Sequence, residues 1–236
     1  ESRHTRAMKC ENYTSMAKYM PMMKQNCYRL LRLINNLIDI TRIDSGYMKL
    51  NSGNYNIVSV VEDIALSVAD FSESKGINLV FDTDVEEKII GCDPDKIERI
   101  ILNLLSNSIK FTYPGGDIFV DISDKGEKVS IRVKDTGIGI PKDKLDIIFE
   151  RFRQVDSSLQ REYEGSGIGL SLVKALVEAH RGNILVNSEE SLGTEVIIEL
   201  PAALISAEDN EIKNTFDRQK MDKVQRINIE FSDIYK

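Results

Sequence analysis

The sequence predicts an α+β domain in which a mixed, mostly antiparallel sheet is covered by helices on one face and is preceded by one long helix. Three observations support this fold class. The stretches "DIFVDIS" and "KVSIRVKD" alternate apolar and polar residues, as half-buried neighbouring strands do. Segments 94–111 and 169–179 carry the apolar spacing of helices. A longer amphipathic stretch precedes all of these, which places one helix outside the sheet domain.

The long helix is expected to begin near Pro21, because proline suits the first turn of a helix. An apolar stripe then runs along one face, formed by Cys27, Leu30, Leu31, Ile34, Leu37, Ile38 and Thr41. No second long helix with a matching stripe is found nearby. We therefore expect a partner helix from another subunit or from upstream sequence, and a homodimer formed through this helix. The alternative is that the stripe packs on its own domain.

Residues 51–202 are expected to form the main domain, in which turn residues separate the elements. The helix at 94–111 has a clear start, because Asp93 can act as its N-cap and Pro94 fits its first position. The expected elements are, in order, a strand at 55–57, a helix at 58–75, strands at 78–81 and 89–91, the helix at 94–111, two strands around Gly126, a helix at 169–179 and a last hairpin with Gly193 in its turn.

The C-terminal residues 203–236 read as a charged linker and a tail. The end, "KVQRINIEFSDIYK", alternates at Val224, Ile227, Ile229 and Phe231, which indicates an added strand or a docking peptide.

Composition excludes several classes of function. The net charge of −7 argues against a nucleic-acid partner, since such proteins are usually basic. The three cysteines have no metal-ligand spacing and there are only two histidines, so a zinc site is not expected. We expect the cysteines to be reduced thiols of a cytosolic protein. No stretch resembles a membrane span. Because the chain opens with Glu1 rather than Met, we expect a piece of a longer protein.

Polar residues on the helix at 94–111 indicate one wall of a binding site. Asn103, Asn107 and Lys110 are spaced four and three apart, so they lie on one helix face. Amide oxygens are ligands that Mg²⁺ accepts, and a lysine ammonium suits phosphate. The alternative is an ordinary solvated helix face.

Two glycine-rich turns, "DTGIGI" and "EGSGIGL", follow the strand that ends at Asp135. A carboxylate at a strand end can accept a hydrogen bond from the amino group of adenine, and Gly137 and Gly139 would let a ring approach the backbone. The second turn leads into a helix whose free N–H groups favour an anion. The polar stretch between the turns, about 154–164, is expected to be a mobile lid over one nucleotide. Each turn taken alone is also compatible with an ordinary connection.

Together and in this order, these motifs resemble the ATP-binding domain of bacterial sensor histidine kinases. "NLLSNSIKFT" is similar to the N box of that family, "DTGIGI" to G1, "IFERFRQVD" to the F box and "GSGIGLSLVKALVEAH" to G2. The resemblance implies the Bergerat or GHKL ATPase fold, with residues 1–50 as part of the dimerisation region. It also implies that ATP is bound by Asn103, Asn107, Lys110, Asp135, Gly137, Gly139, Arg153, Gly165, Ser166, Gly167, Gly169, Leu170 and Thr194, and that Asn107 coordinates Mg²⁺.

The same resemblance predicts the activity. We expect the catalytic part of a protein-histidine kinase that moves the γ-phosphate of ATP to a histidine, for relay to the receiver domain of a response regulator. It would act as a cytoplasmic domain, compatible with attachment of the full-length protein to the inner membrane. His4 lacks the acidic neighbour and nearby proline of the family's acceptor motif, and His180 is better explained as a partner of a helix dipole, so the acceptor is not expected in this chain.

Two other functions share the fold. A nucleotide-gated interaction or ATPase module would use ATP to close a lid, and a hydrolytic member should carry a glutamate in the N-box helix, where Glu98 lies too early. A serine kinase of the anti-sigma type would not need the long helix. The long helix therefore favours the histidine kinase.

Overall fold

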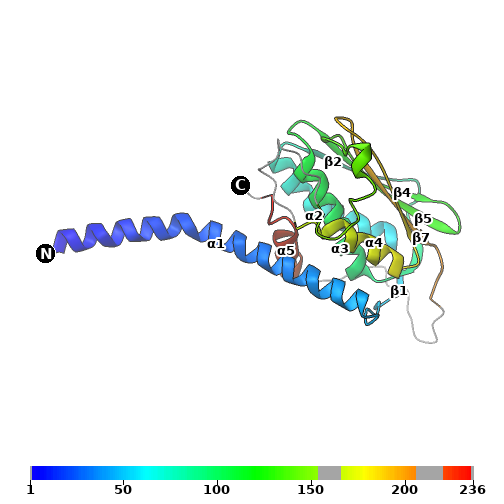
Figure 1. The fold of residues 1–236 in the computed structure, drawn as a ribbon, viewed down its shortest axis with the longest axis horizontal. Coiled ribbons are helices and arrows are strands. Elements are labelled where there is room, and N and C mark those ends of the chain that lie inside the picture. Colours follow the sequence, from blue (N-terminus) through cyan, green and yellow to red (C-terminus); the bar gives the residue numbers. More distant parts are fainter. Residues whose placement is uncertain (1, 154–165, 206–219, 235–236) are drawn as a thin grey trace.

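The computed structural model describes residues 2–153, 166–205 and 220–234, with side chains described from residue 19 onward except at 220–223. One long helix leads into a two-layer domain, and a short C-terminal helix lies between the two (Figure 1). The helices are α1 (Ser2–Asp44), α2 (Ile57–Ser74), α3 (Pro94–Phe111), the 3-10 turn η1 (Lys142–Lys144), α4 (Gly169–Ala179) and α5 (Lys220–Glu230). The strands are β1 (Gly53–Asn56), β2 (Asn78–Thr83), β3 (Ile89–Cys92), β4 (Asp117–Asp124), β5 (Lys128–Asp135), β6 (Asn183–Glu189) and β7 (Gly193–Pro201).

The main sheet has five strands in the order β2-β4-β5-β7-β6. Only β2 and β4 run parallel in it, and the other neighbours are antiparallel, which confirms the predicted mixed sheet. Strands β1 and β3 form a separate antiparallel pair. Alternation puts Val129, Ile131, Val133 and Asp135 of β5 on one buried face. Helices α2, α3 and α4 cover that face, as expected (Figure 1).

Local signals set the start of α3 as predicted. The Asp93 carboxylate accepts hydrogen bonds from the backbone N–H groups of Asp95 and Lys96, and Pro94 occupies the first turn. The apolar side of the helix packs into the core through Ile97, Ile100, Ile101, Leu104 and Leu105. The remaining side, with its amides and Lys110, is thereby directed away from the core centre.

Two expectations about helices were wrong. Helix α1 begins at Ser2 and continues through Pro21. Proline has no N–H group, so one carbonyl group of the preceding turn loses its helical hydrogen bond. The helix is exposed at Pro21, so water can form a hydrogen bond with that carbonyl group instead. The C-terminal end is the helix α5 followed by a turn, so the expected strand is wrong, whereas the other alternative, a docking segment, agrees with its packing on α1 and α3. The partly buried Ile227 and the buried Phe231 and Ile234 are spaced four and three apart, which also fits a helix, and a short apolar pattern cannot separate a helix from a strand.

Helix α1 has two different faces. Its apolar stripe remains exposed, with Leu30 at 58%, Ile34 at 44% and Leu37 at 51% exposure. The polar face, in contrast, packs on the domain through Arg32, Asn36 and other residues. The alternative that the stripe covers its own domain is therefore wrong. None of the described helices combines the length and the apolar character needed to cross a membrane.

Candidate functional site

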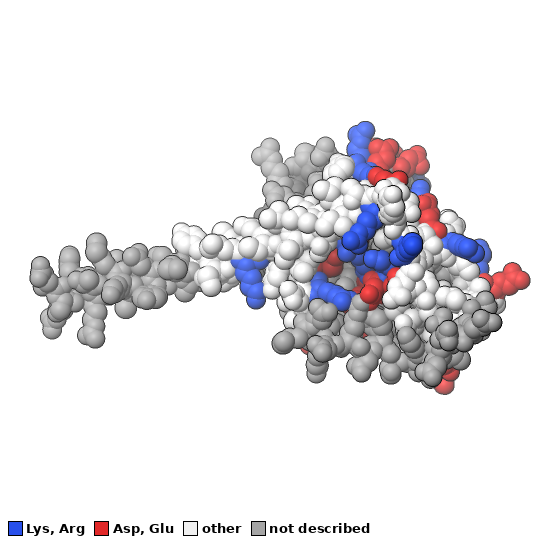
Figure 2. All heavy atoms as spheres, turned by 90° about the horizontal axis from the view of Figure 1, so that it is seen from below, with Lys and Arg blue, Asp and Glu red and all other residues white. Residues whose placement is uncertain are grey.

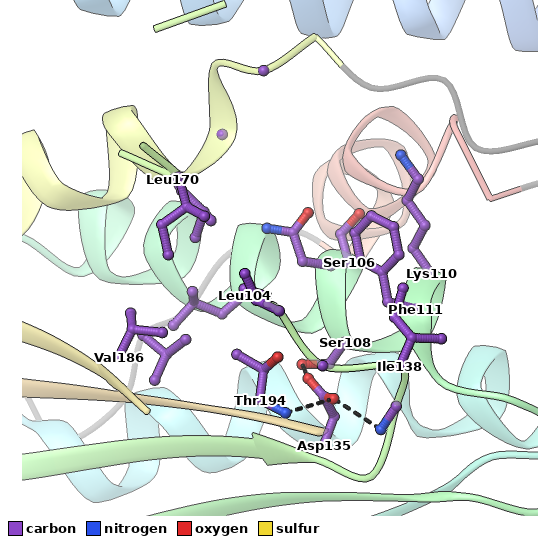
Figure 3. A pocket seen from close by; sticks show the side chains of 18 of the residues that line it. Leu104, Ser106, Ser108, Lys110, Phe111, Asp135, Ile138, Leu170, Val186 and Thr194 are labelled. Atoms are coloured by element: carbon purple, nitrogen blue, oxygen red, sulfur yellow. Dashed lines mark hydrogen bonds between the residues drawn. The ribbon is translucent and has the colours of Figure 1, made fainter. Parts of the chain in front are cut away.

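A pocket of about 690 Å³ lies between α3, the end of β5, the loop after it, the start of α4 and strands β6 and β7. Residues from α1 and from the turn after α5 complete one end of it. The side chains that converge on the pocket come from segments far apart in the sequence (Figure 3). On the face of the domain seen in Figure 2, Lys and Arg side chains gather with acidic side chains among them.

The α3 wall contains two of the three polar residues expected there. Asn107 and Lys110 line the pocket, and Asn107 is half-exposed while Lys110 is nearly buried. The Lys110 ammonium lies 5.1 Å from the centre of the Phe111 ring. Asn103 lies one turn deeper and is not part of the lining: its side chain is fully buried, and its Nδ2 donates to the Arg99 carbonyl over 2.9 Å. Asn103 Oδ1 has no hydrogen-bond partner among the described residues.

Asp135 lies at the base of the pocket because β5 points it to the helix-covered face. Its Oδ1 accepts from the backbone N–H groups of Gly137 at 3.0 Å and Thr194 at 3.1 Å. The Ser108 hydroxyl donates to Oδ2 over 3.1 Å (Figure 3). Burial raises the pKa of Asp135 above its ordinary value, and these three hydrogen bonds oppose the rise. The site is therefore a buried carboxylate held in one orientation, with acceptor capacity left on Oδ2.

The glycines of the first turn are required by close chain packing. A Cβ at Gly137 would lie 2.4 Å from the Phe111 carbonyl oxygen, and one at Gly139 would lie 1.9 Å from that of Glu189. Gly139 also has a φ of +67°, which other residues rarely adopt. Both residues line the pocket. Their lack of side chains therefore brings α3 and the β6–β7 turn together around the pocket.

The second turn places the start of α4 at the pocket. Ser166, Gly167, Gly169 and Leu170 all line it. The N-cap position, Ile168, supplies no side-chain hydrogen bond, so the first N–H groups of α4 are left for another partner. Gly169 also packs closely on α3, since a Cβ there would lie 3.0 Å from Asn103 Oδ1.

The remaining expected residues fall in two groups. Arg153 and Thr194 line the pocket, and Arg153 forms an exposed ion pair with Glu150 at 3.2 Å. Gly165 and the expected lid at 154–164 lie outside the described residues.

His180 has a different role from the one expected. Its Nε2 accepts from the backbone N–H of Asp93 at 3.1 Å, and its Nδ1 lies 2.8 Å from the Leu176 carbonyl oxygen. Burial lowers the pKa of His180 and so favours the neutral ring. A neutral ring is not the cationic partner of the helix dipole that the sequence predicted.

Several pocket residues were not among those expected from the sequence, and three of them carry charged or polar contacts. Ser108 holds the carboxylate of Asp135, and Arg32 and Asp233 close the end beside α1 and α5. Ser108 lies one residue after Asn107 on a helix with recognisable polar spacing, so its place near the site could have been predicted from the sequence. Arg32 and Asp233 are separated by 201 residues in sequence and meet only through the fold.

The described residues offer few metal ligands. They contain no group of three or more His, Cys, Asp or Glu side chains arranged to hold a metal ion. The accessible amide of Asn107 fits a cation that takes most of its ligands from water and substrate phosphates, as Mg²⁺ does.

Comparisons with known proteins agree with this geometry. Residues 92–204 match the family model described as histidine kinase-, DNA gyrase B-, and HSP90-like ATPase. The hybrid signal transduction histidine kinase D of Dictyostelium discoideum is 34% identical over 217 residues, which cover 90% of this chain and 14% of that protein. This relative is not bacterial, so the resemblance extends beyond bacterial kinases.

Solved structures show the same fold. Full-length ShkA in complex with AMPPNP matches with a TM-score of 0.70 and 28% identity, over 81% of this chain and 40% of that one. Histidine kinase ThkA in complex with response regulator protein TrrA matches with a TM-score of 0.61 and 21% identity, over 80% of this chain and 52% of that one. The chain thus spans less than two thirds of each of these proteins.

Proposed function

Because residues 92–204 belong to the histidine kinase-, DNA gyrase B-, and HSP90-like ATPase family and are homologous to the catalytic domains of sensor histidine kinases, we propose that this chain is the ATP-binding part of such a kinase. It transfers the γ-phosphate of ATP to a histidine outside this chain, for relay to a response regulator. The observation that carries the proposal is the buried carboxylate of Asp135, placed in one pocket with Asn107, Lys110 and the start of α4.

The adenine ring fits the Asp135 end of the pocket. A fixed carboxylate accepts from the exocyclic amino group of adenine and would repel the carbonyl oxygen that guanine has at that place. Val186, Ile138 and Leu170 supply apolar contact for a flat ring. The binding of AMPPNP, an ATP analogue, by ShkA supports this choice of ligand.

The triphosphate then extends toward Asn107 and Lys110. Asn107 Oδ1 is the group we propose for Mg²⁺, which would neutralise phosphate charge when bound. Lys110 and the first N–H groups of α4 are positioned to favour the negative oxygens. Phosphoryl transfer needs mainly position and charge neutralisation from the protein, so this set is sufficient for the nucleotide side of the reaction.

The exposed stripe of α1 favours a kinase over the alternative ATPase or interaction module. Leu30, Ile34, Leu37 and Ile38 form a continuous apolar face on a helix that joins the domain directly. We propose that this face pairs with the same helix of a second copy, giving a homodimer. Complete burial of each such side chain contributes roughly 1.5–3 kcal/mol.

The division of the chain follows from these roles. We propose residues 1–50 as part of the dimerisation region, 51–202 as the ATP-binding domain and 203–236 as a C-terminal extension. The domain would act in the cytoplasm, whether or not the full-length protein is anchored to a membrane. A serine kinase of the anti-sigma type remains the second alternative, and it gives no role to the stripe.

The test is Asn107→Ala, measured by calorimetric titration with ATP in the presence and absence of Mg²⁺. Loss of a hydrogen-bonding or ligating group next to charge costs about 1.5–3 kcal/mol, so we expect Mg-ATP binding to weaken roughly 10- to 100-fold. Asn183→Ala, at an exposed position of β6, is the matched control and should bind normally. Unchanged affinity in a folded Asn107 variant would contradict the proposed site.

A further inference from the structure

The C-terminal segment 224–234 is built into the protein between α1, α2 and α3 (Figure 1). Phe231 is fully buried and meets Phe71 of α2 edge to face, with ring centres 5.0 Å apart. The Ser106 hydroxyl of α3 donates to the Glu230 carbonyl at 3.0 Å, and the Lys75 ammonium donates to the Ile234 carbonyl at 3.1 Å. The segment therefore has a defined seat formed by three helices.

Charged contacts join the same segment to α1. Arg32 donates from Nε to Glu230 over 3.0 Å and from Nη1 to Asp233 over 2.8 Å. Arg29 lies 3.4 Å from the other oxygen of Asp233. The Arg32 and Glu230 side chains are about nine-tenths buried, so this contact is only weakly screened by water.

These charges lie at the pocket. Arg32 and Asp233 both line it, at the end where Ser106, Asn107 and Lys110 of α3 are found. Lys110 extends toward the coil of α5, whereas Asp135 lies at the opposite end (Figure 3). In the function proposed above, this is the end that receives the triphosphate. A carboxylate there opposes binding of an anion and occupies the guanidinium that could accept it.

Resting on that function, we propose that residues 224–234 form a displaceable inhibitory strap, in which Glu230 and Asp233 hold Arg32 and the triphosphate of ATP competes with them for it. The free energy that Arg32 loses with its carboxylate partners can be offset by a phosphate partner. Removing one partner of a buried ion pair is costly when the other charge is left alone, but a phosphate oxygen replaces the carboxylate at Arg32 and avoids that cost. Arg32 is then a phosphate-binding residue supplied by α1, outside residues 92–204 that match the ATPase family model.

Thermodynamic linkage allows the coupling between ATP binding and docking of residues 224–234 to be measured in two ways. If docking of the segment weakens ATP binding, then ATP must weaken docking of the segment by the same factor. Coupling between two sites is typically about 5-fold or more. Nucleotide affinity and the protection of the strap backbone therefore report the same quantity independently.

The experiment uses Asp233→Asn in the full chain, titrated with Mg-ATP by calorimetry. We expect the dissociation constant to fall by about 5-fold or more. Glu199→Gln changes the net charge equally but belongs to an exposed pair with Lys128, so it is the matched control and should leave affinity unchanged. Adding Arg32→Ala to Asp233→Asn should remove the gain. Hydrogen exchange of residues 224–234 in the unmodified chain should become faster when AMPPNP is added.

The possible results distinguish failure of the strap from failure of the proposed function. Equal affinity of the Asp233 variant and the unmodified chain, or slower exchange of the strap with AMPPNP, overturns the strap and leaves the proposed function standing. The same gain in the Glu199 variant shows a net-charge effect and also overturns it. Lack of ATP binding in every folded variant overturns the proposed function and the strap together.

Discussion

Replacing Asp135 by Asn separates nucleotide recognition from folding, because the substitution keeps the shape of the side chain and removes its charge. The amide oxygen can still accept from the backbone N–H groups of Gly137 and Thr194, which lie 3.0 and 3.1 Å from the present Oδ1. The amide nitrogen then faces the Ser108 hydroxyl, which can reverse its role and accept. All three local hydrogen bonds therefore survive in the variant.

Stability is expected to be retained. Burial raises the pKa of Asp135, so the native protein disfavours the ionised carboxyl relative to the unfolded chain. Such a group contributes stability at low pH, and the contribution is lost as pH rises through the folded pKa. At neutral pH the neutral amide avoids this loss, and the free energy of unfolding of the variant should be no lower than that of the unmodified chain.

Binding is expected to fall. The variant presents an N–H group where adenine needs an acceptor, and loss of a hydrogen bond to a charged group costs about 1.5–3 kcal/mol. This corresponds to a roughly 10- to 100-fold weaker affinity for Mg-ATP. The affinity for Mg-GTP should fall less or rise, because the new N–H group can donate to the guanine carbonyl.

The assay is paired titration of ATP and GTP, with thermal unfolding measured on the same samples. Asp121→Asn is the matched control, since Asp121 lies on β4, pairs with Arg132 and does not line the pocket. Equal binding of ATP and GTP by the unmodified chain, or unchanged ATP affinity in the Asp135 variant, would refute the assignment of Asp135 to adenine.

Two further predictions concern the helix and the pH response. Leu37→Asp should convert the proposed dimer to a monomer in sedimentation experiments without weakening ATP binding, whereas Leu66→Asp at an exposed site of α2 should leave the proposed dimer intact; a monomeric unmodified chain would contradict this. Because burial lowers the pKa of His180 below its ordinary 6.5, its contribution to stability should be present above that pH and be lost as the pH falls. His180→Gln should make the unfolding free energy less dependent on pH below about 6.5, and an unchanged slope would show that another group is responsible.

Elements with strong local signals were predictable from the sequence. Helix α3 begins at Pro94 and ends at Phe111 as expected, because the Asp93 cap and Pro94 act within one turn. The β4–β5 pair was recognisable from its alternation, which is a property of each strand alone. The two ends of the chain gave weaker local signals. Pro21 is compatible with a first turn and with an exposed helix interior, so its position could not fix the start of α1.

The sequence motifs identified most residues of the candidate site, but they did not predict how these residues are arranged in space. Asn107 and Lys110 follow from helix spacing, whereas the burial of Asn103 depends on how closely α4 packs on α3 at Gly169. The contact of Arg32 with Asp233 has no signature in either segment. It depends on where α5 sits, and that position is set by the burial of Phe231 against α2.

The two faces of α1 have different chemistry, and this difference bears on how the protein can move. The face toward the domain buries Ile40 in the core and is otherwise joined by polar contacts, such as Arg99 with Asn36 at 2.7 Å and with Asp39 at 2.9 Å. The opposite face is the exposed apolar stripe. Polar contacts can be exchanged for water or for a ligand anion when the domain moves, whereas separating paired apolar faces exposes them to water at a cost proportional to their area. In the proposed dimer, this arrangement would therefore let the helix keep its apolar partner while its own ATPase domain, with the C-terminal segment, is released and docked again.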